Sequence, residues 1–111
     1  MHVQIVNFNL KDLSDSDFRA ASSDLAPMFA ALPGLLSKVW LADEASNTYG
    51  GVYLWQNKAA MEAYAASDLF KAVVSNPNLV NLTSHDFGIL DGPSRTTAGL
   101  LEAAFQLTAA R

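Results

Sequence analysis

Residues 32–40 read Leu-Pro-Gly-Leu-Leu-Ser-Lys-Val-Trp, and residues 50–55 read Gly-Gly-Val-Tyr-Leu-Trp. The Pro33-Gly34 pair is typical of a helix end, because proline does not continue a helix and glycine adopts the closing conformation. β-Branched and aromatic residues lie on both sides of a polar segment, as in two strands joined by a turn. We therefore predict antiparallel strands over 35–42 and 49–56, with Gly50-Gly51 marking a bulge or a close backbone approach.

The composition is that of one small globular domain. The chain has 111 residues, and half of them are hydrophobic, which is enough for a core. It has no cysteine, which excludes disulfides, zinc–thiolate sites and cysteine nucleophiles and is compatible with a reducing cytoplasm. We expect a soluble cytoplasmic protein without membrane partners, because the sequence has no signal-peptide pattern and no apolar run long enough to span a membrane. Nucleic-acid partners are not expected either, because the net charge is −4.

The remaining segments complete the order strand, helix, strand, strand, helix, strand. Residues 3–10 and 79–90 are predicted as the first and fourth strands, and residues 68–74 as a helical turn after the second helix. The apolar stripes expected on the two helices are Phe18, Ala21, Leu25, Met28 and Leu32, and Ala60, Met61, Tyr64 and Ala65. This order predicts an α+β, ferredoxin-like βαββαβ fold, in which four antiparallel strands carry both helices on one face.

Polar residues set the expected helix limits. Ser14 or Asp15 is the candidate N-cap of the first helix, and Asn57 that of the second. Pro27 removes a backbone donor, so we expect either a kink there or a short second helix that starts there.

The sheet face away from the helices needs its own cover. The residues expected on it are Lys38, Trp40, Tyr49, Tyr53 and Trp55. A contiguous apolar face of this kind marks an interface, so we predict a homodimer in which two sheets pack face to face. Residues 1–92 form the predicted domain, and residues 93–111 a C-terminal helical extension that packs on its own domain or on the partner subunit.

The motif Pro33-Gly34-Leu35-Leu36-Ser37-Lys38-Val39-Trp40, followed by Gly50-Gly51-Val52-Tyr53-Leu54-Trp55, resembles the YdhR monooxygenase family. This family belongs to the dimeric α/β-barrel superfamily that includes the antibiotic-biosynthesis monooxygenases. The resemblance implies a dimeric barrel with a pocket between sheet and helices in each subunit. Better-understood relatives oxygenate aromatic polyketides there without metal or flavin, or degrade haem.

The haem-degrading branch places an Asn on the first strand, a Trp on the second helix and a His ligand a few turns later. By the resemblance, Asn7 matches the Asn, whereas Tyr64 stands at the Trp position and Val74 at the His position. A proximal ligand is therefore missing, and haem degradation is disfavoured. No metal or other cofactor is expected.

Three residues are candidate catalytic groups. His85 is a candidate general base, although a solvated strand histidine is the more common case, and its neighbour Asp86 points to the opposite face of the strand. Lys38 is suited to binding a phenolate or to lowering the pKa of a phenol. The alternative is a lysine that extends its stem at the sheet edge or pairs across the dimer. Tyr64 offers a phenolic hydroxyl on the second helix.

Four further residues are candidate substrate contacts. Trp40, Tyr53 and Trp55 are suited to stacking an aromatic substrate, and Asn7 to hydrogen bonding a substrate oxygen. Packing in the core or an interface is the alternative role of the three aromatic residues.

By the resemblance, we expect a small cofactor-independent monooxygenase that acts on a hydrophobic, aromatic small molecule. The alternatives are a non-catalytic small-molecule-binding or stress-response dimer of the same fold, and a purely structural dimer.

Overall fold

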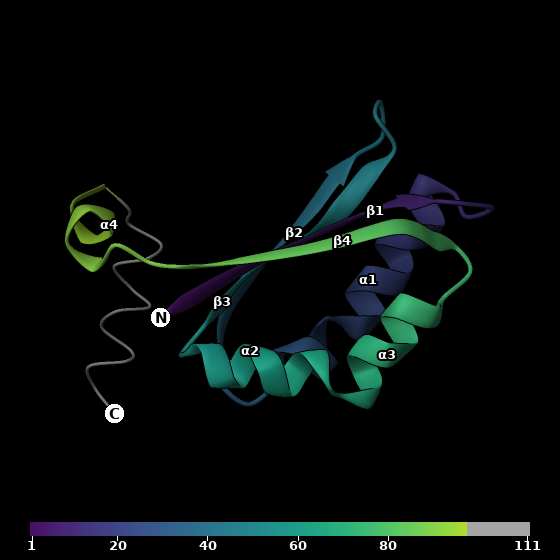
Figure 1. Cartoon of the computed structure of the whole chain (residues 1–111). Coiled ribbons are helices and arrows are strands. Elements are labelled where there is room, and N and C mark those ends of the chain that lie inside the picture. Colours follow the sequence, from purple (N-terminus) through teal and green to yellow (C-terminus); the bar gives the residue numbers. More distant parts are fainter. Residues whose placement is uncertain (98–111) are drawn as a thin grey trace.

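The structure is a computed structural model that describes residues 1–97. Its elements are β1 (His2–Leu10), α1 (Asp15–Ala30), β2 (Leu35–Asp43), β3 (Thr48–Trp55), α2 (Lys58–Ala65), α3 (Asp68–Ser75), β4 (Leu79–Gly88) and α4 (Asp91–Thr97). The strands form one antiparallel sheet in the order β2-β3-β1-β4. The helices α1, α2 and α3 lie on one side of this sheet, and α4 lies beyond its end (Figure 1). The predicted ferredoxin-like fold is confirmed, with an additional helix after β4. No helix of the described residues is both long enough and apolar enough to span a bilayer.

The helices begin where polar side chains satisfy their first backbone donors. Ser14 accepts a hydrogen bond from the amide of Asp17, and Asn57 accepts one from the amide of Ala60. The predicted caps are confirmed. Pro27 lies in the last turn of α1, which continues to Ala30, so the alternative of a second helix starting at Pro27 is wrong. Proline at this position removes the hydrogen bond of its own nitrogen, and the helix ends three residues later.

The helix-facing side of the sheet is rich in aromatic residues. Its buried cluster consists of Val6, Phe8, Phe29, Tyr49, Tyr53, Trp55, Met61 and Tyr64. Lys38 and Trp40 of β2 pair in register with Tyr53 and Gly51 of β3, on this same face. The prediction that Lys38, Trp40, Tyr49, Tyr53 and Trp55 occupy the uncovered face is therefore wrong, although they do share one face.

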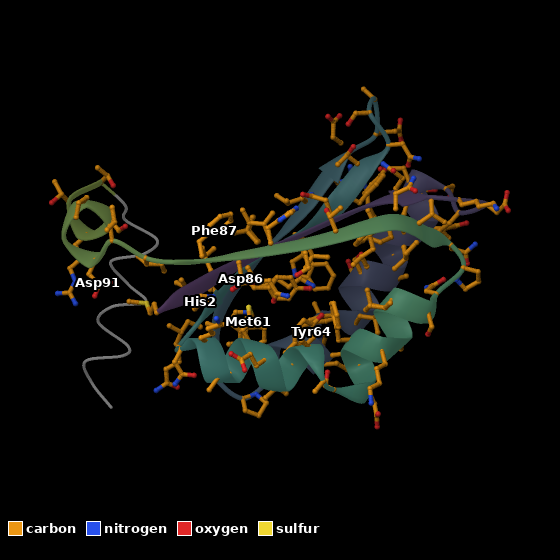
Figure 2. All side chains as sticks on the ribbon, in the orientation of Figure 1. His2, Met61, Tyr64, Asp86, Phe87 and Asp91 are labelled. Carbon is orange, nitrogen blue, oxygen red and sulfur yellow. The ribbon has the colours of Figure 1, made fainter. Side chains whose placement is uncertain are left out.

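The uncovered face carries mainly apolar side chains. They come from the alternate positions of the strands and are the aliphatic Val3, Ile5, Val39, Leu41, Val52 and Leu54 and the aromatic Phe87. Figure 2 shows Phe87 on the side of β4 away from the helices, whereas Tyr64 points from α2 toward the sheet. Both faces of the sheet are thus apolar, which is why alternation alone did not distinguish them.

The inner stripe of α1 also differs from the prediction, and Leu25 in it is 39% exposed. Phe29 is buried, whereas Met28 is exposed. Phe18, Leu25 and Phe29 follow one another at spacings of seven and four, and this phase places Met28 one position off the inner face.

The close approach predicted at Gly50-Gly51 is confirmed. Gly50 has a φ of +152°, and a Cβ at this position would lie 1.8 Å from the carbonyl oxygen of Val6. Only glycine fits such a position. The pairing of β3 with β1 and β2 continues through both glycines without a shift in register, so there is no bulge.

Candidate functional site

An inner cavity of about 110 Å³ lies between α1 and the sheet. Its walls are mostly apolar and come from all four strands as well as from α1 and α3. The residues that line it and matter for the chemistry are Phe18, Phe29, Lys38, Trp40 and Tyr53. The sequence motif of β2 and β3 thus supplies three of these side chains directly.

Lys38 is the one lysine of residues 1–97 that lines this cavity. Its Nζ lies 3.5 Å from the ring centroid of Phe29, 3.4 Å from that of Trp40 and 4.6 Å from that of Tyr53. The stem of Lys38 uses space that only glycine leaves open, because a Cβ on Gly51 would lie 2.8 Å from Lys38 Cε. The glycine at 51 therefore helps to place the amine among the rings.

The electrostatic surroundings of Lys38 are unusual. Burial lowers its pKa from 10.5 to about 7, because the charged form loses hydration. Within residues 1–97 no carboxylate forms an ion pair with it. The three ring faces act against the shift in pKa, since they attract an ammonium group. The neutral amine and the ammonium are consequently both accessible near neutral pH.

Tyr53 and Tyr64 form a buried hydroxyl pair next to the cavity. Their hydroxyl oxygens lie 3.2 Å apart, and either group can donate. Burial raises the pKa of both phenols, so both stay neutral near pH 7. Tyr53 lines the cavity, and Tyr64 of α2 lies behind it. The pair can donate one hydrogen bond toward a guest and retain another internally.

The structure places the other predicted site residues elsewhere. Trp55 is fully buried, and its Nε1 donates to Gln4 Oε1 at 3.0 Å, which is a core role. Asn7 donates to the carbonyl oxygen of Tyr49 at 3.4 Å, on the uncovered face of the sheet. His85 pairs with Ile5 in register and is exposed on that same face. These three side chains do not line the inner cavity.

One polar pair was missed by the sequence analysis. His2 Nε2 lies 2.6 Å from Asp86 Oδ2, on the helix-facing side of β1 and β4 (Figure 2). The predicted topology could have indicated this pair, because it places the start of β1 next to the end of β4. As predicted, Asp86 and His85 point to opposite faces and form no dyad.

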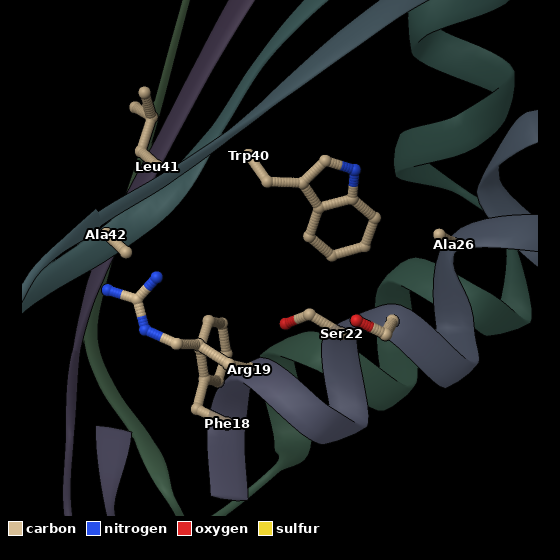
Figure 3. A pocket seen from close by; sticks show the side chains of 8 residues that line it. Phe18, Arg19, Ser22, Ala26, Trp40, Leu41 and Ala42 are labelled. Carbon is tan, nitrogen blue, oxygen red and sulfur yellow. The ribbon is translucent and has the colours of Figure 1, made fainter. Parts of the chain in front are cut away.

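Two shallower hollows open beside the inner cavity. One, of about 320 Å³, runs between α1 and β2 and is lined by Phe18, Arg19, Ser22 and Trp40 among others (Figure 3). The other, of about 300 Å³, lies toward the start of β2 and is lined by Phe29, Lys38 and Trp40 among others. The inner cavity and the hollows thus share walls along the α1–β2 edge.

The donor set does not fit a histidine-ligated haem. Val74, at the position expected for the ligand, is an exposed aliphatic residue of α3. His2 is bonded to Asp86, and His85 lies on the far side of the sheet. Among residues 1–97 no cluster of three metal-ligating side chains occurs.

Solved structures share this fold. A putative antibiotic biosynthesis monooxygenase from Deinococcus radiodurans is 15% identical, with 80% of this chain and 92% of that chain covered and a TM-score of 0.66. SnoaB, a cofactor-independent oxygenase from Streptomyces nogalater, is 20% identical over 79% of this chain and 92% of that chain, with a TM-score of 0.61. MhuD, a heme-degrader from Mycobacterium tuberculosis, is 18% identical over 81% of this chain and 96% of that chain, with a TM-score of 0.63. At these identities the likeness concerns the fold.

A match to a protein-family model goes further than the fold. No curated protein matches the chain. The model described as "Putative mono-oxygenase ydhR" matches residues 3–100, which is nearly the whole chain and includes every strand and the Lys38-Val39-Trp40 motif. The chain therefore belongs to the YdhR mono-oxygenase family.

Proposed function

We propose that this protein is a cofactor-independent monooxygenase of phenolic small molecules, with Lys38 as the group that takes up the substrate proton. The observation that carries the proposal is the Lys38 amine among three aromatic rings, without a carboxylate partner in residues 1–97 and with a pKa of about 7. A base with a pKa near the working pH is suited to proton transfer. The ammonium that results is suited to holding the phenolate by charge.

The proposed reaction balances without a further reductant. The phenol proton passes to the neutral amine of Lys38, and the phenolate gives one electron to dioxygen. The phenoxyl radical and superoxide combine at a ring carbon to a peroxide anion, which takes the proton back from the Lys38 ammonium. The resulting hydroperoxide loses water to leave a quinone. One oxygen atom of dioxygen enters the product and the other leaves as water, so a phenol C₆H₆O and O₂ become C₆H₄O₂ and H₂O.

The neighbouring residues have distinct roles in this proposal. Trp40 and Tyr53 hold the substrate ring by stacking, because both line the cavity. The Tyr53–Tyr64 hydroxyl pair supplies a hydrogen bond to the developing superoxide or peroxide. His85, Asn7 and Trp55 receive no role in this chemistry, because none of them lines the cavity.

We further propose that the protein is a cytoplasmic homodimer. The uncovered face of the sheet supports the dimer, because Val39 and Phe87 are 44% and 55% exposed there among other apolar residues. A sheet with one apolar face uncovered gains stability by burying it. The absence of cysteine agrees with a reducing compartment.

A binding protein without catalysis is the second candidate. The same arrangement favours it, because an ammonium faced by three rings also suits simple retention of an anionic aromatic compound. The two candidates differ in the consumption of dioxygen, not in affinity.

The test is dioxygen uptake by the purified protein with a panel of phenols and hydroquinones. We expect the wild type to take up dioxygen with at least one of these compounds. The rate of uptake falls by about 10²-fold or more in Lys38→Met, because this variant lacks the proton acceptor. The rate falls less in Tyr64→Phe, which keeps the ring and loses only the hydroxyl. Lys71→Met, at an exposed lysine of α3, is the matched control and retains the wild-type rate. Tight binding of phenols without any dioxygen uptake establishes the binding protein instead, and equal rates in Lys38→Met and Lys71→Met remove Lys38 from the mechanism.

A further inference from the structure

Trp40 is the wall that the inner cavity and both hollows have in common. It lines the inner cavity of about 110 Å³, the α1–β2 groove of about 320 Å³ and the hollow of about 300 Å³ toward the start of β2. In Figure 3 the indole projects from β2 into the space in front of α1. Its ring thus stands between the small inner space and the two larger outer ones.

The indole is held in this position by its neighbours. It packs edge to face on Phe29, with ring centroids 5.2 Å apart and an interplanar angle of 78°, and Lys38 Nζ lies 3.4 Å from its centroid. Across the sheet its partner in register is Gly51, and the space over this glycine is taken by the Lys38 stem, since a Cβ there would lie 2.8 Å from Lys38 Cε. Trp40 is therefore held between Phe29 and Lys38, and its size helps to decide how far the inner cavity extends.

The inner cavity of about 110 Å³ has room for no more than one aromatic ring. A cavity of about 150 Å³ lined by aliphatic and aromatic residues takes up a single benzene, and the inner cavity is smaller than that. A fused three-ring compound extends beyond such a space and has to reach past Trp40 into the groove.

We propose that Trp40 is the specificity-determining residue of the site and restricts its substrates to phenols with a single ring. The inference rests on the proposed function, because it concerns the same cavity and the same amine. Lys38 fixes the hydroxyl end of the ligand, and Trp40 sets the distance from that end to the wall. Polycyclic phenols are excluded by the indole, and not by a lack of apolar surface in the groove behind it.

Binding without turnover tests this selectivity. Equilibrium dialysis under nitrogen, read by absorbance, gives dissociation constants for phenol and for 1-hydroxyanthraquinone, which has three fused rings. We expect the wild type to prefer phenol at least about tenfold, and Trp40→Ala to reduce or reverse this preference by at least about tenfold, because the inner cavity then merges with the groove. If the alanine variant does not fold, Trp40→Phe takes its place, because it keeps a ring against Phe29. We expect the ratio of its two dissociation constants to lie between those of the wild type and of a fully opened cavity.

Met28→Ala is the matched control, because Met28 is exposed on α1 and lines none of the three spaces. It retains the wild-type preference. The size restriction is overturned if the wild type binds both compounds equally. It is also overturned if neither Trp40 variant changes the ratio of the two dissociation constants. Both outcomes leave the phenol site intact. A wild type that binds neither compound overturns the phenol site and the inference together.

Discussion

The amine of Lys38 links the chemistry of the cavity to the stability of the fold. Its pKa is about 7 in the folded chain and 10.5 for a hydrated lysine. Between these values the unfolded chain holds a proton that the folded chain does not, so the free energy of unfolding rises with pH across this window. The slope for one such group is about 1.4 kcal/mol per pH unit, and the ring faces narrow the window because they favour the ammonium.

Lys38→Met tests this linkage. We expect wild-type stability, measured by urea denaturation, to increase from pH 7 to pH 9.5, and the variant to lack this increase and to exceed the wild type at pH 7. The reason is that methionine fills the same space without a charge to desolvate. Lys71→Met, at an exposed lysine, retains the wild-type slope. Parallel pH profiles for the wild type and both variants contradict a desolvated amine at position 38.

At the level of elements, the start of α1 is fixed to β3 by one carboxylate. Asp15 accepts hydrogen bonds from Tyr49 Oη at 2.5 Å and from Arg19 Nε at 2.7 Å. The bond to Arg19, and then that to Tyr49, lowers the pKa of Asp15, and the same carboxylate raises the pKa of Tyr49 to about 12. This attachment joins the start of α1 to β3 beside the edge-to-face contact of Phe18 with Tyr49, whose ring centroids lie 5.0 Å apart.

Tyr49→Phe is therefore expected to lower the melting temperature at pH 7, because it removes the hydrogen bond between α1 and β3. Asp15→Asn is expected to lower it as well, because the acceptor of that bond and of the bond from Arg19 loses its charge. The folded-state pKa of Asp15 lies below its usual 3.8, so its contribution is present above that pH and is lost as the pH falls through the lowered pKa. Thermal unfolding followed by circular dichroism across this range checks both statements. Asp24→Asn, on the exposed side of α1, is expected to have no effect, and an equal effect there would mean that general helix charge and not the attachment is responsible.

The arrangement of the elements was predictable, whereas the side of the sheet that they cover was not. The Pro33-Gly34 stop and the polar turn between β2 and β3 gave the order of strands and helices, because these signals are local. The prediction that Lys38, Trp40 and Tyr53 share one face of the sheet was also correct, because side chains alternate between the two faces along a strand. Their face depends on packing against helices distant in sequence, and Val39 and Val52 make the alternate positions equally apolar. For the same reason His85 was a candidate until the register of β4 placed it away from the cavity.

At the scale of the whole molecule, one face of the sheet is covered by α1, α2 and α3, and the other is covered by no helix among residues 1–97 except where α4 approaches its end (Figure 1). The C-terminal extension predicted over residues 93–111 begins earlier, since α4 runs from Asp91 to Thr97, and the part beyond residue 97 lies outside the described residues. The cross-strand pair Val39 and Val52 on this face lines a hollow of about 500 Å³ that also reaches Ser94 of α4, and Val39 is 44% exposed. This pair lies on the reverse side of the same strands that hold Lys38 and Tyr53, so dimerisation would stiffen the wall of the cavity from behind.

Val39→Lys tests the proposed dimer at this pair. We expect the wild type to sediment as a dimer and the variant as a monomer, because two copies of a new ammonium would meet in an apolar interface without partners. Val74→Lys is the matched control, since Val74 is 52% exposed on α3 and Val39 is 44% exposed on β2. The control retains the dimer, because α3 lies on the opposite side of the sheet. Sedimentation velocity at several concentrations separates the cases. A monomeric wild type overturns the dimer. A Val39→Lys variant that stays dimeric while Val74→Lys dissociates places the contact away from the open face of the sheet.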